Sequence, residues 1–167
     1  MKFAILGDIH ANLEALEAVL ADAAAMGVTN HVCIGDIVGY NANPHECVKR
    51  IQSLECPVVK GNHDEEASAE TEITGLNPLA MAALLWTREA LLPEDKQWLR
   101  ELRLVRQVRD FTIVHSTLDT PGSWTYVLNK FDAMASFSYQ FTQLCFFGDT
   151  AAPGIYTKGL SVNTEAG

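Results

Sequence analysis

Lys2-Phe3-Ala4-Ile5-Leu6, an apolar run, leads directly into Gly7-Asp8-Ile9-His10. The run has the length and composition of a buried β-strand, and the glycine marks a turn at its end. Because Asp8 and His10 are two residues apart, extended backbone would place both side chains on one side of the chain. A carboxylate with an imidazole suits Mn, Fe or Zn rather than a thiophilic ion. This stretch therefore predicts half of a metal site at the end of the first strand.

Three later strand-like runs end in side chains of the same kind. Residues 32–35 lead to Asp36, residues 57–60 lead to Gly61-Asn62-His63-Asp64, and residues 111–114 lead to His115. Asp8, Asp36 and Asn62 recur at roughly 25 to 30 residues, about the size of a βαβ repeat, which favours a parallel sheet with right-handed crossovers. Ligands of such sheets bind beyond the carboxyl ends of the strands. We therefore expect the four strand ends to meet at one rim.

Amphipathic patterns between these runs predict the helices of an α/β protein. Asn12 is placed to cap a helix that continues to about Met26 and stops at Gly27. Asn43-Pro44 reads as a second helix start, with a cap and a proline at the first helical position. Residues 65–74 are expected to form a loop or a short helical insert.

The second half of the chain has weaker patterns. Helices are expected to begin at Asn77-Pro78 and at Pro93, and residues 131–138 also suit a helix. Two strand candidates, residues 104–108 and 111–115, are joined at Arg109-Asp110, and residues 144–148 form the last apolar strand. The helix from Asn77 is expected to bury an apolar face made of Leu79, Ala82, Ala83, Trp86 and Ala90.

Length and composition indicate a single globular domain over residues 1–167. The chain has 48% hydrophobic residues, which excludes a disordered protein. It starts with a strand pattern rather than a basic region and a long apolar stretch, and no run approaches the ~18 apolar residues of a membrane span. A cytoplasmic protein with no membrane contact is the expectation. A formal charge of -9 argues against binding duplex nucleic acid, whereas bound divalent ions could still hold a small phosphorylated substrate.

The cysteines show no C-x-x-C pairing, and two of them lie inside apolar strand runs. We expect reduced, mostly buried thiols rather than metal ligands at Cys33, Cys47, Cys56 and Cys145.

Taken together, G-D-I-H, G-D-I-V-G, G-N-H-D and the later strand-terminal His115 resemble the calcineurin-like metallophosphoesterases. Up to about Tyr156, the chain is similar to the small bacterial phosphoesterases grouped with diadenosine tetraphosphatases. The resemblance implies a layered α/β/β/α sandwich with mixed sheets and a two-metal centre at their loop edge. It also implies hydrolysis of a phosphomonoester, a phosphodiester or a dinucleoside polyphosphate by a metal-activated hydroxide.

The same resemblance implies a role for each motif residue. Asp8 and His10 would bind the first metal, Asp36 would bridge both, and Asn62 and His115 would bind the second. His63 would not be a ligand; it would donate a hydrogen bond to the phosphoryl group or a proton to the leaving oxygen. Asp64 would be the catalytic partner that fixes the tautomer of His63.

Several residues near these motifs have two readings. Tyr40 would bind substrate together with Asn62 and His63, but an ordinary glycine turn explains its segment equally well. Residues 116–126, with Asp119, Trp124 and Tyr126, could wall the pocket. His31 and His45 read as structural or solvated residues.

The sequence departs from the resemblance at Gly148-Asp149-Thr150-Ala151, where the family usually has G-H-x-H. By register, Asp149 replaces a second-metal ligand and Ala151 replaces a first-metal ligand. The first site therefore has fewer donors, and we expect it to be the weaker of the two. The sequence also ends where the family's second sheet normally receives further strands.

Three hypotheses stay open at this point. The chain is a metal-dependent phosphoesterase with a working but weaker centre, a non-catalytic relative that binds a nucleotide or phosphate, or a structural protein with a vestigial site. A homo-oligomer is compatible with each of them.

Overall fold

The computed structural model describes residues 1–71, 77–148, 154–158 and 162–166. Along this part of the chain the elements are β1 (Phe3–Leu6), α1 (Leu13–Ala25), β2 (Asn30–Cys33), α2 (Pro44–Ser53), α3 (Asn62–Ser68), α4 (Pro78–Ala90), α5 (Pro93–Glu101), β3 (Val105–Val108), β4 (Phe111–Val114), the 3-10 turn η1 (Pro121–Ser123), α6 (Lys130–Phe137), β5 (Leu144–Phe146), β6 (Gly154–Lys158) and β7 (Val162–Ala166).

The strands form a parallel pair, a mixed sheet and an antiparallel hairpin. β1 pairs with β2 in parallel, β4 lies between antiparallel β3 and parallel β5, and β6 pairs with β7. The predicted α/β class with mixed sheets is therefore confirmed. Residues 57–60, expected as a strand, instead make two isolated parallel bridges, Cys33 with Val58 and Val59 with Arg103.

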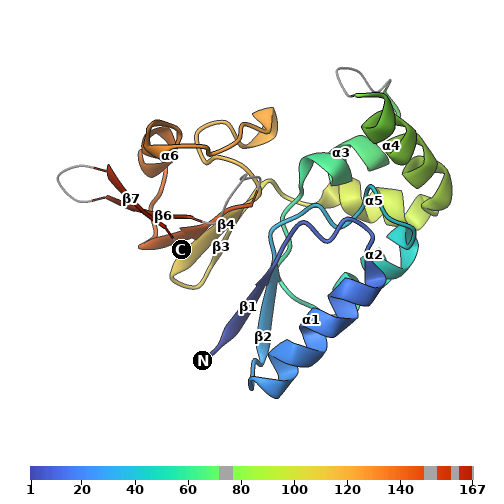
Figure 1. Cartoon of the computed structure of the whole chain (residues 1–167), viewed down its shortest axis with the longest axis horizontal. Helices are drawn as coiled ribbons and strands as arrows, with labels where there is room; N and C mark the ends of the chain where they lie inside the picture. The colour runs from blue at the N-terminus through green and yellow to red at the C-terminus, as the bar shows by residue number, and fades with distance from the viewer. Residues whose placement is uncertain (72–76, 149–153, 159–161, 167) are drawn as a thin grey trace.

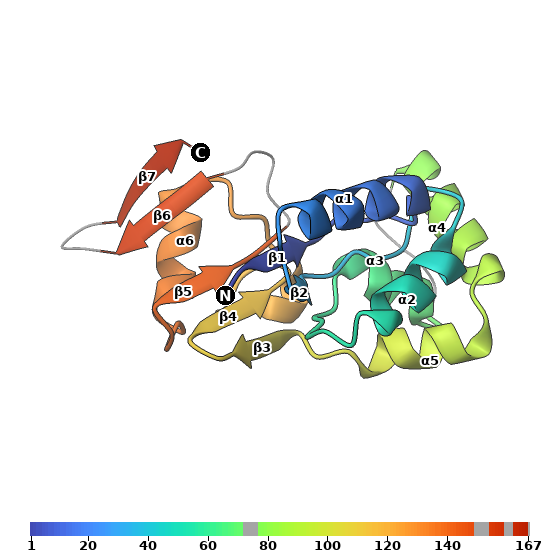
Figure 2. The same cartoon turned by 90° about the horizontal axis from the view of Figure 1, so that it is seen from below.

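Two hydrophobic cores lie on the two faces of the β1–β2 pair. On one face, helices α1 to α5 gather around residues such as Leu16, Ile51 and Leu99 (Figure 1). On the other, β1 and β2 pack against the β3–β4–β5 sheet, seen from below in Figure 2. Here Phe111 makes edge-to-face contacts with Phe3 and Phe146, with ring centroids 5.3 and 5.4 Å apart. This layering leaves the loop ends of both sheets on one side.

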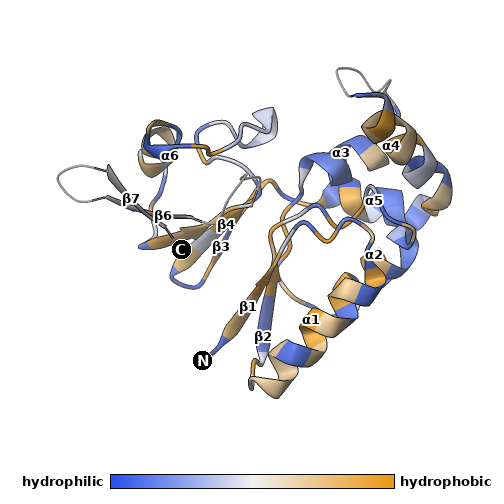
Figure 3. Ribbon diagram, in the orientation of Figure 1, coloured by the Kyte–Doolittle hydropathy of each residue, from blue (hydrophilic) through white to orange (hydrophobic). Residues whose placement is uncertain are grey.

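Local sequence signals explain most of the helix boundaries. The Asn12 side chain accepts a hydrogen bond from Ala15 N at 3.0 Å and so caps α1, and Pro44 opens α2. Asn77 caps α4 through Leu79 N and Ala80 N. Figure 3 shows hydrophobic and hydrophilic residues alternating along α1, which buries Leu16, Leu20 and Ala23. No helix in the part of the chain described above is long and apolar enough to cross a membrane.

The predicted buried face of α4 is wrong. Leu79 is 84% and Trp86 46% exposed, and Ala82 is also exposed, whereas Ala83 and Ala90 are half-buried. The helix instead buries Ala80, Leu84 and Thr87. The apolar residues of α4 are distributed over every face of the helix, so the spacing of apolar residues does not identify the buried face. Thr87 can be buried because its hydroxyl donates to Ala83 O at 2.8 Å.

Helix α3 also begins earlier than expected. It starts at Asn62, within the G-N-H-D motif, rather than in residues 65–74. The motif therefore lies on the first turn of a helix, and not in an extended loop.

Candidate metal centre

The loops that follow β1 and β2 are hydrogen-bonded to each other along their length. Asp8 N donates to Gly35 O at 3.2 Å, and His10 N donates to Asp36 O at 2.9 Å. The loop after β5 joins the same region, because Gly148 N donates to His115 O at 2.9 Å. These contacts bring three of the predicted strand ends to one rim.

Three of the predicted ligands hold a strained backbone. Asp8, His10 and Asp36 have φ values of 51°, 48° and 53°, in the left-handed region. Such a conformation costs about 1 to 3 kcal/mol for a residue with a side chain, and it persists only where the surroundings enforce it. Strain of this kind is typical of functional sites, where it fixes the direction of a side chain.

Two glycines allow the loop after β2 to touch the start of α3. Gly35 has a φ of 99°, and a Cβ there would lie 2.5 Å from Gly61 N. A Cβ on Gly61 would overlap Asp36 Oδ1. The close approach of these segments therefore requires glycine at both positions.

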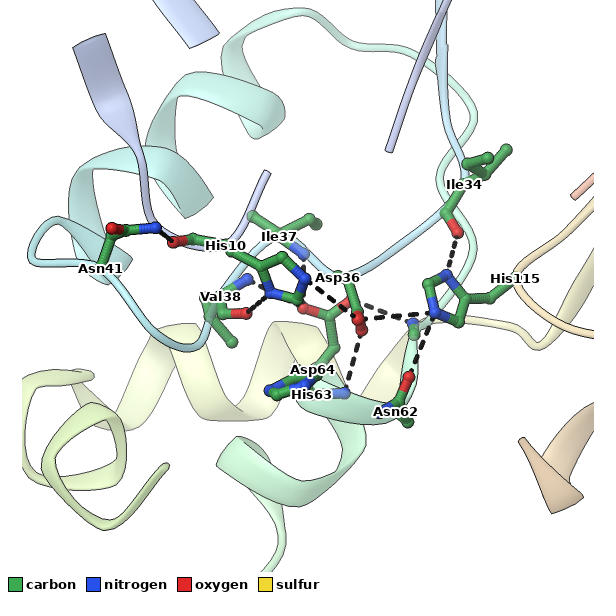
Figure 4. Close-up of polar contacts among 11 residues, drawn as sticks. His10, Ile34, Asp36, Ile37, Val38, Asn41, Asn62, His63, Asp64 and His115 are labelled. Carbon is green, nitrogen blue, oxygen red and sulfur yellow. Dashed lines mark hydrogen bonds and ion pairs between the residues drawn. The ribbon is translucent and has the colours of Figure 1, made fainter. Parts of the chain in front are cut away.

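The Asp36 carboxylate lies at the centre of the site and is only 3% exposed as a residue. Its Oδ1 accepts from His63 N at 2.9 Å, and its Oδ2 lies 3.7 Å from His10 Nε2 and 3.5 Å from His115 Nε2 (Figure 4). Burial opposes ionisation, but hydrogen bonding and positive charge from His115, with smaller contributions from His63 and His10, outweigh it. The pKa of Asp36 is therefore lowered, and its carboxylate is charged at neutral pH.

Both imidazoles that flank Asp36 are oriented by backbone carbonyls. His10 Nδ1 lies 3.2 Å from Val38 O, and His115 Nδ1 lies 2.7 Å from Ile34 O. Since a carbonyl only accepts, Nδ1 of each ring donates to it, which turns Nε2 towards Asp36. Metal-binding histidines typically show this arrangement, with the second nitrogen donating to a carbonyl or carboxylate.

Oxygen atoms of two side chains lie close to Nε2 of His115. Its Nε2 lies 3.2 Å from Asn62 Oδ1 as well as 3.5 Å from the Asp36 carboxylate. An imidazole nitrogen with carboxylate oxygens of Asp8 and Asp36 is a ligand set that divalent ions such as Mn, Fe or Zn bind. The donor set therefore fits a metal ion at this point.

The described side chains form two groups that could each hold a cation. One group is His10, Asp36 and His63, and the other is Asp8, Asp36 and His115; the ligand atoms within each group lie within 4.8 Å of one another. Asp36 belongs to both groups, as a bridging carboxylate would. The groups differ from the predicted sets, because His63 joins His10 and because Asp8 joins His115.

His63 packs beside the centre, and its ring contacts two other rings, edge-to-face with His10 and tilted against Tyr40. Its residue is 8% exposed, and its ring centroid lies 4.8 Å from His10 and 4.6 Å from Tyr40. Its Nδ1 has no hydrogen-bond partner within the described structure and faces Gly39, where a Cβ would lie 2.6 Å away. Burial lowers the pKa of His63, against the opposing charge of Asp36.

Asp64 does not contact His63 in the way the sequence predicted. Its Oδ1 accepts from Ile37 N at 2.9 Å and Val38 N at 3.2 Å, and its Oδ2 accepts from Gly61 N at 3.0 Å. Both oxygens are thus committed to backbone amides around Asp36. Burial and the charge of Asp36 raise the pKa of Asp64 to about 7. Its visible role is to hold the loop after β2 against α3.

The remaining predicted site residues lie at the edge or outside the described region. Tyr40 is 53% exposed and contacts the rings of His10 and His63, and Trp124 lies beside His115. Asp149 and Ala151 lie outside the described residues. His45 binds Asp95 Oδ2 through Nδ1 at 2.7 Å, which confirms its structural role.

All four cysteines are free, as the sequence indicated. Cys33 and Cys47 are buried, whereas Cys56 and Cys145 are half-buried. Burial raises the pKa of Cys47 to about 12 and that of Cys33 even further, so these thiols stay protonated at neutral pH.

Several supporting groups could not be found from the sequence motifs. The carbonyls of Ile34 and Val38 and the amide of Gly61 come from backbone that carries no distinctive side chain. The G-D-I-V-G and G-N-H-D motifs contain these positions, but they do not show which backbone group meets which side chain.

Comparison with known proteins agrees with this geometry. Residues 1–160 match the calcineurin-like phosphoesterase superfamily domain, and the chain belongs to that superfamily. The metallophosphoesterase of Sphaerobacter thermophilus is 35% identical with a TM-score of 0.81, over 98% of this chain and 68% of that one.

Two other relatives extend the comparison. Uncharacterized protein MJ0912 of Methanocaldococcus jannaschii is 34% identical over 159 residues, which make up 93% of this chain. The chain spans 64% of the length of that relative. A solved "putative diadenosine tetraphosphatase" shares the fold at 17% identity, with a TM-score of 0.56 over 98% of this chain and 63% of that one.

Proposed function

We propose that this chain hydrolyses a phosphoester of a small phosphorylated substrate and depends on two divalent ions, Mn, Fe or Zn. The observation that carries the proposal is the Asp36 carboxylate between two imidazoles, each with its Nδ1 on a backbone carbonyl and its Nε2 towards Asp36 Oδ2. Divalent ions held there would polarise phosphoryl oxygens, lower the pKa of a bound water and offset the chain's net charge of -9 near the substrate.

The protein's own groups have separate tasks in this reaction. Asp36 would hold both ions, with Asp8, His10, Asn62 and His115 completing their ligand sets. Its buried, ionised carboxylate suits that task because two cations offset its charge. A water molecule adds to phosphorus and gives up one proton, the ester P–O bond breaks, and the leaving oxygen takes up a proton, so the products are a phosphate and an alcohol.

His63 is our candidate for the group that acts on the substrate. It lies beside His10 and Asp36, and its lowered pKa keeps the ring neutral at neutral pH. A neutral ring still carries one N–H, and Nδ1 is packed against Gly39 without a partner. Since Nδ1 has no acceptor within the described structure, we place the proton on Nε2. That N–H would donate to a phosphoryl oxygen or to the leaving oxygen.

The test combines metal content with turnover of an aryl phosphate. Protein purified without chelators and supplied with Mn should contain metal and hydrolyse phenyl phosphate. The variant His63→Ala should keep its metal and lose about 10²- to 10⁴-fold in kcat. His45→Ala is the matched control, because it removes a histidine that binds Asp95 outside the site. This variant should keep the metal content and the turnover of the wild type.

One further outcome would contradict the role of His63, and another would contradict the hydrolysis. Loss of metal in His63→Ala would make His63 a ligand, as its place beside His10 and Asp36 allows. Stabilisation of the wild type by phosphate without turnover would favour the alternative, a relative that binds a nucleotide or phosphate and does not hydrolyse it. The cytoplasmic location and a homo-oligomer stay predictions from sequence.

A further inference from the structure

Two bulky aromatic residues at the site have a backbone conformation that such residues rarely adopt. Tyr40 has a φ of 63° and Trp124 a φ of 54°, both in the left-handed region that favours glycine. A glycine would occupy either position without strain, so the aromatic side chain itself calls for an explanation. Strain at a residue that borders a site points to a role for its side chain there.

Tyr40 contacts the two imidazoles of His10 and His63 on one side of the centre. Its ring centroid lies 4.8 Å from that of His10 and 4.6 Å from that of His63. Two hydrogen bonds hold the turn that carries Tyr40. Asn41 Nδ2 donates to His10 O at 2.8 Å, and Asn41 N donates to Gly39 O at 2.9 Å. Tyr40 is nevertheless 53% exposed, so a large part of its ring faces solvent.

Trp124 lies on the other side of the centre. Its ring centroid lies 6.2 Å from that of His115 with an interplanar angle of 69°, and the residue is half-buried. It follows η1 in a loop held by Ser116 Oγ, which donates to Pro121 O at 3.0 Å. His10 and His115 lie on opposite sides of Asp36 in Figure 4, so the two aromatic residues flank the centre.

We propose that Tyr40 and Trp124 select phosphoesters whose leaving group is planar and aromatic, such as an aryl or nucleobase-bearing group. This inference rests on the proposed hydrolysis, since it names the class of substrate for the same site. A phosphoryl group placed at Asp36 would leave its ester substituent to extend towards one aromatic residue or the other. A planar substituent gains stacking there that a small alkyl substituent lacks, a difference of roughly 5- to 100-fold in affinity per stacked ring.

The experiment compares two phosphonates that cannot be hydrolysed, phenylphosphonate and methylphosphonate. Their binding to the Mn-loaded protein is measured by calorimetry. The wild type should bind phenylphosphonate roughly 5- to 100-fold more tightly. The preference should shrink in Tyr40→Ala and in Trp124→Ala, and most in the double variant. Tyr40→Phe should keep it, because stacking needs the ring and not the hydroxyl.

A matched control removes an exposed tyrosine away from the centre. Tyr139 follows α6 and is 56% exposed, so Tyr139→Ala should leave the phosphonate preference unchanged. Metal content, measured in every variant, should stay constant, which separates lost stacking from a lost centre.

The outcomes distinguish this inference from the proposed function. Equal affinity for the two phosphonates, no binding of either, or a preference that survives the double variant would overturn the aromatic selection. A preference for phenylphosphonate without hydrolysis of phenyl phosphate would support the selection and refute the hydrolysis. Hydrolysis of phenyl and methyl phosphate with equal kcat/KM would refute the selection and leave the hydrolysis standing.

Discussion

Asp36 is the residue on which the electrostatics of the centre depend. Its two oxygens divide their contacts: Oδ1 accepts from the backbone of α3, and Oδ2 faces two imidazoles. Asp8, in contrast, appears in one of the two ligand groups and is exposed. A change at Asp36 should therefore affect both cations, whereas a change at Asp8 should affect one.

The first prediction is that Asp36→Asn lowers the occupancy of both metal sites together. The amide keeps the size of the carboxylate and an oxygen for His63 N, but it removes the charge that two cations share. Elemental analysis after gel filtration should show fewer than one metal per chain. Asp8→Asn is the matched variant and should lose no more than one. Retention of two metals by Asp36→Asn would contradict the bridging role.

At the residue scale, sequence could predict which side chains meet but not what holds them. Asp8 and Asp36 follow neighbouring parallel strands and His115 follows a strand of the mixed sheet, so strand ends and the packing of the two sheets bring them together. The Asp64 carboxylate was misassigned because its partners are the amides of Ile37, Val38 and Gly61, which any residue type would supply. Backbone partners leave no signal in the side-chain pattern.

At the scale of elements, the first turn of α3 and the loop after β2 fit together through Gly61. Gly61→Ala is the second prediction: its Cβ would overlap Asp36 Oδ1, so one of the two segments must move. We expect a loss of about 1 to 3 kcal/mol in the free energy of unfolding, as for overpacking in a core. Metal affinity should fall as well. Both are measured, by urea unfolding and by metal titration.

Gly122→Ala is the control for that variant. A Cβ at Gly122 would meet only Leu104 Cδ1, at 3.4 Å, which is nearly ordinary contact. Its stability and metal affinity should therefore stay close to those of the wild type. Unchanged metal affinity in Gly61→Ala would show that the loop and α3 are not rigidly interlocked.

The other end of α3 is held by arginines. Arg88 Nε donates to Glu66 O at 2.8 Å and Arg88 Nη1 donates to Thr71 O at 2.7 Å, while Arg100 Nη1 donates to Ser68 O at 2.8 Å. These side chains come from α4 and α5 and donate to carbonyls in the last turn of α3 and to one just beyond it, at Thr71.

The third prediction is that Arg88→Ala destabilises the fold by about 1.5 to 3 kcal/mol, the range for hydrogen bonds that involve a charged group. Two carbonyls lose their donor at once, and Arg88 itself is largely buried, at 17% side-chain exposure. Urea unfolding measures the loss. Arg106→Ala removes an exposed arginine from β3 and should change stability by less than about 0.5 kcal/mol.

For the whole molecule, short-range signals predicted the element order better than they predicted packing. Caps and prolines at Asn12, Pro44 and Asn77 gave helix starts that the structure confirms. The buried face of α4 and the pairing of residues 57–60 depend on contacts between segments far apart in sequence, such as Val59 with Arg103. No local pattern carries that information.

The candidate metal centre also connects the parts of the molecule. Its side chains come from the loops after β1 and β2, from α3 and from the end of β4, so bound ions would tie the parallel pair to the mixed sheet. Ligands that bind only the folded chain stabilise it by mass action, about 2.7 kcal/mol at a concentration of 100 Kd. For a chain of this size, each kcal/mol raises Tm by about 2 to 4 °C.

The last prediction is that a saturating excess of Mn raises Tm of the wild type by about 5 to 10 °C, and that a chelator reverses the rise. Asp36→Asn should show almost no rise, because the shared ligand is gone. Asp95→Asn is the control: it removes a buried carboxylate that binds His45 at 2.7 Å, so its starting Tm should be lower while its response to Mn persists. A Tm of the wild type that does not respond to Mn, at concentrations where metal is shown to bind, would mean that the ions bind the unfolded chain as well as the folded one, and would contradict a metal centre assembled by the fold. If Asp95→Asn alone fails to respond to Mn, the metal site depends on the contact between His45 of α2 and Asp95 of α5.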